Sequence, residues 1–80
     1  MNSRPEPAEI LDARGLSCPL PVLKARKRLA AMQPGQILQV IATDPMAIID
    51  LPHFCNEAGH RLVHQETQGP DHLFLIECRR

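Results

Sequence analysis

Hydrophobic and polar residues are spaced along the chain in segments that predict four strands. Residues 9–13 and 36–42 are short apolar runs, typical of strands that a helical layer covers. Residues 61–67 and 72–78 are two further strand-like runs, and the Gly-Pro-containing segment 68–71 between them predicts a turn. The last two strands should therefore form a hairpin.

The segment from Cys18 to about Met32 has the spacing of an amphipathic helix, and Gln33-Pro34-Gly35 ends it. Its apolar positions fall on one face, with Leu23 and Ala30 at the edges of that face. The residues on the face itself are Val22, Ala25, Leu29 and Met32.

A second helical segment covers residues 46–58. Asp44 is expected as its N-cap with Pro45 at the first helical position, and Gly59 as its C-cap. Because proline cannot lie deep in an uninterrupted helix, Pro52 predicts a short turn and a helix that restarts near Asp50.

The order strand–helix–strand–helix–strand–strand implies two crossover connections and a final hairpin. Right-handed crossovers place both helices on one face of the sheet, which predicts an α/β two-layer sandwich with one exposed sheet face. Residues 1–8, with two prolines and no apolar run, are expected to be a disordered tail, and residues 9–80 a single domain.

Composition narrows the range of functions. The 80 residues carry nine Lys and Arg against nine Asp and Glu, so the formal net charge is zero, and Trp and Tyr are absent. Neutral charge and only two aromatic residues argue against stable nucleic-acid binding, although the fold plan alone is compatible with an RNA-binding domain. Nothing resembles a signal peptide or a membrane span, so we expect a cytoplasmic protein with free thiols.

The three cysteines match no disulfide framework and no zinc ligand spacing. Cys55 falls on the apolar face of the second helix and is interpreted as structural, although it would resolve a persulfide if it approached Cys18. Cys78 is interpreted as a strand residue. The spacing of His53, Cys55 and His60 fits no standard metal site, so no metal is expected.

Cys18 is the candidate reactive residue, because Pro19 and Pro21 confine it to the start of the first helix. The residue before a proline favours extended geometry, so Cys18 is expected as the N-cap, with Pro19 at the first helical position. Gly15, in the preceding turn, is free to adopt a positive φ. A helix N-terminus favours the thiolate, but the prolines remove two donors, so we expect a moderately activated, exposed thiol without a pocket.

The first helix is strongly basic. Lys24, Lys27 and Arg28 lie opposite its apolar face and are interpreted either as a docking surface for an acidic partner or as an ordinary solvated face. Arg26 falls within the apolar face, where it either extends its charged end to solvent or reaches an acidic partner or the strand edge near the thiol.

The segment Leu11-Asp12-Ala13-Arg14-Gly15-Leu16-Ser17-Cys18-Pro19-Leu20-Pro21 resembles the TusA/SirA family of small sulfur carriers, with its Cys-Pro-x-Pro signature. Thr43-Asp44-Pro45, Asp50-Leu51-Pro52, Phe54-Cys55 and Gly59-His60 also fit this family. The similarity covers about residues 9–78, nearly the whole chain.

This resemblance implies a mixed sheet in the order 1-2-4-3, with the fourth strand antiparallel to the others. It also implies that Cys18 receives sulfane sulfur as a persulfide from a cysteine desulfurase and passes it to an acceptor protein. The destinations would be 2-thiouridine in tRNA, molybdenum-cofactor enzymes or sulfur oxidation.

The expected protein is then a monomeric carrier rather than a turnover enzyme, with no cofactor besides the covalently held sulfur. The alternative is a regulatory or interaction module that uses the basic helix and the exposed sheet face.

Overall fold

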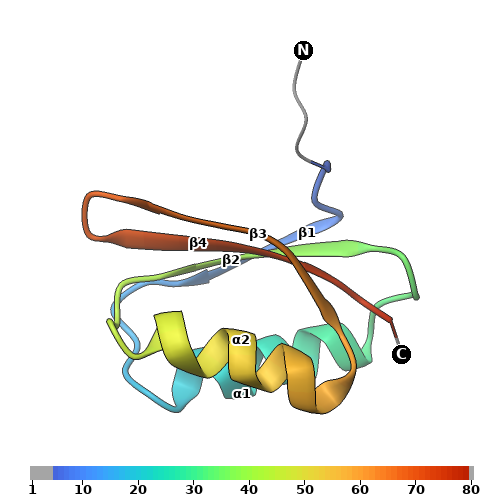
Figure 1. Ribbon diagram of the computed structural model, residues 1–80, viewed down its shortest axis with the longest axis horizontal. Coiled ribbons are helices and arrows are strands. Elements are labelled where there is room, and N and C mark those ends of the chain that lie inside the picture. The colour runs from blue at the N-terminus through green and yellow to red at the C-terminus, as the bar shows by residue number, and fades with distance from the viewer. Residues whose placement is uncertain (1–4, 80) are drawn as a thin grey trace.

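In the computed structural model, which describes residues 5–79, four strands form one layer and two helices form the other (Figure 1). The elements follow the predicted order: β1 (Glu9–Ala13), α1 (Leu20–Ala30), β2 (Ile37–Ala42), α2 (Ala47–Ala58), β3 (Arg61–Gln68) and β4 (Asp71–Glu77). Both helices cover the same face of the sheet, so the predicted α/β two-layer sandwich is confirmed.

The sheet has the order β1-β2-β4-β3. Strands β1 and β2 are parallel, with Leu11 opposite Val40, and β4 is antiparallel to both β2 and β3. A register shift interrupts β3 between Leu62 and His64. The mixed sheet that the family resemblance implied is therefore confirmed.

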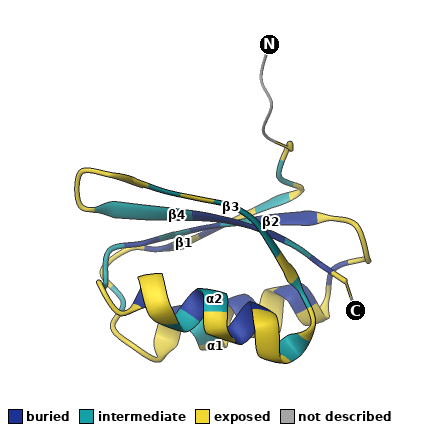
Figure 2. Ribbon diagram, viewed as in Figure 1, coloured by how far each residue is buried: buried dark blue, intermediate teal, exposed yellow. Residues whose placement is uncertain are grey.

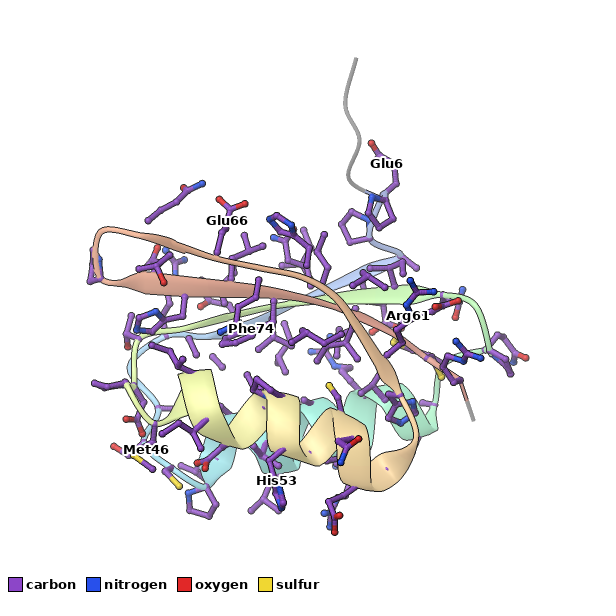
Figure 3. All side chains as sticks on the ribbon, in the orientation of Figure 1. Glu6, Met46, His53, Arg61, Glu66 and Phe74 are labelled. Carbon is purple, nitrogen blue, oxygen red and sulfur yellow. The ribbon has the colours of Figure 1, made fainter. Side chains whose placement is uncertain are left out.

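The core lies between the sheet and the helices (Figure 2). Alternate residues of the central strands, such as Val40 and Phe74, are fully buried, and Figure 3 shows Phe74 between the two layers. Leu29 of α1 and Leu51 of α2 are also fully buried and cover the sheet from the helical side. Burial of this apolar surface is the main stabilising contribution to a domain of this size.

The first helix begins later than predicted. A turn closed by the Leu20 N–H and the Ser17 carbonyl, 2.8 Å apart, contains Cys18, and the Leu23 N–H is the donor to the Pro19 carbonyl. Pro19 is therefore the N-cap, and Pro21 is the second helical residue. The expectation that Cys18 is the N-cap and Pro19 the first helical residue was wrong.

The second helix runs without a break through Pro52, contrary to prediction. Its first turn is tightened by bonds from Ala47 N–H to the Asp44 carbonyl and from Ile48 N–H to the Pro45 carbonyl. Because Pro52 is the sixth residue, its missing N–H removes one bond near the start, and the packing of the apolar face holds the rest.

The two ends of α2 differ in how far they match prediction. Met46 is the N-cap, so the expectation of Asp44 in that place was wrong. Gly59 ends the helix with a φ of 82°, as predicted.

Of the N-terminal segment, residues 1–4 lie outside the described part of the chain. The Ala8 N–H donates to the Ile37 carbonyl at 2.8 Å, which continues the pairing of β1 with β2. The prediction of a tail before a single domain at residues 9–80 stays a prediction. Within residues 5–79, no helix has the length and apolar character needed to cross a bilayer.

Candidate functional site

Cys18 lies on the loop between β1 and α1 and is the exposed thiol of the three, since Cys55 and Cys78 are buried. The loop turns at Gly15, whose φ is 81° and whose N–H donates to Thr43 Oγ1 at 2.9 Å. This bond ties the loop to the segment that precedes α2. The Cys18–Pro19 peptide bond is cis, and Pro21 is buried under the first turn of α1.

Two carboxylates from the start of α2 hold the cysteine. Asp44 Oδ2 accepts a hydrogen bond from the Cys18 backbone N–H at 2.6 Å, and Asp44 Oδ1 accepts one from the Met46 N–H. The thiol itself donates to Asp50 Oδ2, with the Sγ atom 2.8 Å from the oxygen. The sequence predicted Asp44 as a helix cap and a helix that restarts near Asp50, whereas the structure brings both aspartates to Cys18.

This environment raises the pKa of the Cys18 thiol above its ordinary value. The hydrogen bond to Asp50 is the largest cause, followed by desolvation and the negative charges of Asp50 and Asp44. The helix end offers little compensation, because the Leu20 N–H is bonded to Ser17 and Pro21 has no N–H. The expectation of a moderately activated thiol was therefore wrong, because the pKa of Cys18 is raised rather than lowered, whereas its exposure is as predicted.

An open groove of about 860 Å³ adjoins Cys18 between the two helices. The sequence predicted no pocket here. Arg26 of α1 and Phe54, Glu57 and Ala58 of α2 are among the residues that line it. The Arg26 guanidinium carbon lies 5.6 Å from the centre of the Phe54 ring, so Arg26 covers the wall of the groove by a cation–π contact.

The remaining basic residues of α1 lie on its exposed side. Lys24 and Lys27 take part in no ion pair within residues 5–79, whereas Arg28 Nη1 pairs with Glu9 Oε1 at 3.2 Å. Of the four predicted docking residues, Arg26 thus lines the groove, Arg28 is paired within the molecule, and Lys24 and Lys27 remain available to a partner.

Exposed apolar side chains gather at the same end of the helical layer. They come from the start of α1 and the start of α2, the two segments that hold Cys18. Figure 3 shows Met46 at this end of α2. These side chains are Leu20, Leu23, Met46, Ile48 and Ile49.

The other candidate residues have structural surroundings. Burial raises the pKa of Cys55 to about 11, and Cys78 Sγ donates to the Leu29 carbonyl at 3.5 Å. His60 Nδ1 accepts the Arg79 N–H at 3.1 Å, and the His60 and Phe54 rings are 5.9 Å apart. Within residues 5–79 no three His, Cys, Asp or Glu side chains are grouped to hold a metal ion.

Comparison with known proteins gives a consistent family assignment. Residues 9–78 match the protein family described as "Sulfurtransferase TusA". A "Sulfur carrier protein TusA" from Allochromatium vinosum is 48% identical over 67 residues, which cover 84% of this chain and 88% of that protein. The crystal structure of a SirA-like protein from Desulfitobacterium hafniense has the same fold, with a TM-score of 0.77 at 23% identity, covering 90% of this chain and 99% of that one.

Proposed function

Because the chain belongs to the TusA family of sulfur carriers, we propose that Cys18 holds sulfane sulfur as a persulfide. A donor protein such as a cysteine desulfurase supplies this sulfur, and an acceptor protein removes it. The onward destination is one of those that the family resemblance implies: 2-thiouridine in tRNA, molybdenum-cofactor enzymes or sulfur oxidation.

The observation that carries the proposal is the exposure of Cys18, whose thiol is accessible, whereas the thiols of Cys55 and Cys78 are buried. Sulfur exchange between proteins requires that one sulfur atom approach another along the S–S axis, and a buried cysteine is inaccessible to such an attack. Cys18 satisfies this requirement, and the turn of residues 17–20 holds it in one place.

Loading is an exchange reaction at sulfur. The Cys18 sulfur attacks the outer sulfur of the donor persulfide, a new S–S bond forms at Cys18, and the S–S bond of the donor breaks. The electron pair leaves with the donor sulfur, which takes up the proton that Cys18 gives up. Discharge repeats the exchange, with an acceptor cysteine as the attacking group.

The surface around Cys18 supports transfer between docked proteins. Exposed apolar side chains at the starts of the two helices, such as Leu20 and Ile49, offer a contact area. The free ammonium groups of Lys24 and Lys27 would attract an acidic partner surface.

The test is to incubate the protein with a cysteine desulfurase and L-cysteine and to measure its intact mass. The proposal predicts a gain of one sulfur atom in the wild type and in Cys55→Ser, and no gain in Cys18→Ser. An equal gain in Cys18→Ser, or none in the wild type, would show that Cys18 does not carry the sulfur.

A further inference from the structure

The Asp50 carboxylate contacts the sulfur of Cys18 directly, and no positively charged side chain within residues 5–79 is paired with it. Its Oδ2 lies 2.8 Å from Cys18 Sγ, and none of the ion pairs within residues 5–79 includes it. The Asp50 N–H donates to the Met46 carbonyl at 2.8 Å, which anchors the carboxylate on the first turn of α2. An anionic sulfur at Cys18 would therefore lie against a fixed negative charge.

The other charged and titratable groups near the thiol form no ion pair with Asp50 within residues 5–79. Asp44 adds a second negative charge and is bonded to the backbone of Cys18 rather than to its sulfur. The positive charge of Arg26 lies over the Phe54 ring. The groups that line the groove with Cys18 and Asp50 are Arg26 from α1, His53 and Glu57 from α2, and His60 beyond its end.

We propose that the Asp50 carboxylate keeps the sulfur at Cys18 in its protonated forms, as a thiol in the empty carrier and as a neutral persulfide in the loaded one. This inference rests on the proposed persulfide function. An S–S bond is about 2.05 Å long, so the outer sulfur of the loaded form is within one bond length of Sγ and remains beside the carboxylate.

The protonation state of the Cys18 persulfide decides whether the loaded carrier reacts as a nucleophile or as an electrophile. A persulfide anion is a nucleophile that repels an incoming thiolate, whereas the outer sulfur of a neutral persulfide accepts electrons from it. In discharge the acceptor thiolate bonds to the outer sulfur, the S–S bond breaks, and its electron pair goes to Cys18 Sγ. In the same step the Asp50 carboxylate takes the proton of the outer sulfur and gives it to Sγ, so that Cys18 leaves as a neutral thiol rather than as a thiolate beside a negative charge.

The same contact protects the empty carrier, because small electrophiles react with the thiolate rather than the thiol. Asp50 therefore has opposite effects on two reactions. It slows modification of the empty carrier and speeds removal of sulfur from the loaded one.

The test compares the wild type with Asp50→Asn, which keeps the shape of the side chain and removes its charge. Each protein is loaded with inorganic polysulfide, and its mass confirms the bound sulfur. Two rates are then measured at neutral pH: alkylation of the empty protein by iodoacetamide, and release of thiocyanate when cyanide attacks the loaded protein. Cyanide takes the outer sulfur and leaves the Cys18 thiol, so the reaction reports discharge without a partner protein.

We expect Asp50→Asn to lower the midpoint of the alkylation pH profile. Each pH unit by which the midpoint falls increases the fraction of thiolate at neutral pH about tenfold and lowers the nucleophilicity of that thiolate about threefold. The alkylation rate at neutral pH should therefore rise about threefold for each such unit. Thiocyanate release should fall several-fold in the same protein. Asp50→Glu, which restores a carboxylate, should move both rates back towards the wild type.

Glu57→Gln is the matched control, because it removes the same charge from the same groove about 10 Å further along α2. Both of its rates should stay within about twofold of the wild type on this account. Unchanged rates in Asp50→Asn, a change of both rates in the same direction, or an equal effect of Glu57→Gln would overturn the inference. If Asp50→Asn fails to fold by circular dichroism, Asp50→Ser supplies the neutral side chain.

Failure of this inference is distinguishable from failure of the proposed function. Absence of any sulfur mass on Cys18 after loading contradicts the persulfide carrier, and the alkylation rates still test the contact with Asp50. Normal loading without the opposed rate changes contradicts only the role of Asp50.

Discussion

Gly15 sets the position of the reactive loop through its backbone conformation. Its φ of 81° is one that a residue with a Cβ adopts at a cost, and its N–H is bonded to Thr43 Oγ1. Apart from Gly15 itself and its two chain neighbours, no atom of the described residues lies within 4 Å of the place where a Cβ would be added. The requirement for glycine is therefore conformational and not steric.

Gly15→Ala should lower the free energy of unfolding by about 1–2 kcal/mol, which is the cost of a left-handed conformation for an L-residue. Gly15→Asn should cost less, since asparagine tolerates this region better. Urea unfolding followed by circular dichroism measures both. Equal stability of wild type and Gly15→Ala would show that the loop does not depend on this φ.

Residues of the site differ in how far the sequence reveals them. Cys18 was predictable because the two prolines that follow it, Pro19 and Pro21, are close to it in sequence. Its contact with Asp50 was not, because it joins residues 32 positions apart and depends on how the two helices meet. The available signal was the Asp50-Leu51-Pro52 motif, which was interpreted as a helix start. The raised pKa of Cys18 follows mainly from that contact, and the groove is lined by residues of both helices.

The first helix packs on the sheet through a narrow face, and two of its leucines, Leu29 and Leu23, show the contrast. Leu29 is fully buried, whereas Leu23, six residues earlier, has 47% of its surface exposed. The spacing of apolar residues predicted this difference, since Leu23 falls at the edge of the apolar face. Local capping geometry was less predictable: α1 begins only after the Ser17–Leu20 turn, and α2 continues through Pro52.

Leu29→Ala should destabilise the protein by about 2–5 kcal/mol, the range for a buried leucine that leaves a cavity. Leu23→Ala, the matched substitution on the exposed side, should stay within about 0.5 kcal/mol. Midpoints of urea unfolding test the pair. Similar losses for the two variants would contradict the orientation of α1.

At the scale of the whole molecule, net charge is zero, but α1, which begins two residues after Cys18, carries Lys24 and Lys27, and neither lysine takes part in an ion pair within residues 5–79. The order of elements and the two layers were predictable from hydrophobic spacing and the handedness of crossovers. The position of β4 between β2 and β3 followed only from the family resemblance, because spacing alone does not order strands in a sheet.

Docking to a donor desulfurase should depend on where the charge lies and not only on its total. The double variant Lys24→Gln/Lys27→Gln removes two positive charges and should slow association by roughly tenfold at low salt. Gln36→Glu/Gln65→Glu alters net charge by the same amount on exposed residues outside α1 and should have a smaller effect. Stopped-flow association rates over a range of salt concentrations measure both, and equal slowing would argue against docking through α1.

The central claim is that Cys18 both accepts and releases sulfane sulfur. Its most direct test is to load the protein from L-cysteine carrying a heavy sulfur isotope, remove the desulfurase, add an acceptor thiol and map the peptides by mass. The account predicts that the peptide with Cys18 gains one heavy sulfur on loading and loses it to the acceptor, while the peptides with Cys55 and Cys78 stay unlabelled. Label on either buried cysteine, or label that the acceptor cannot remove from Cys18, would contradict it.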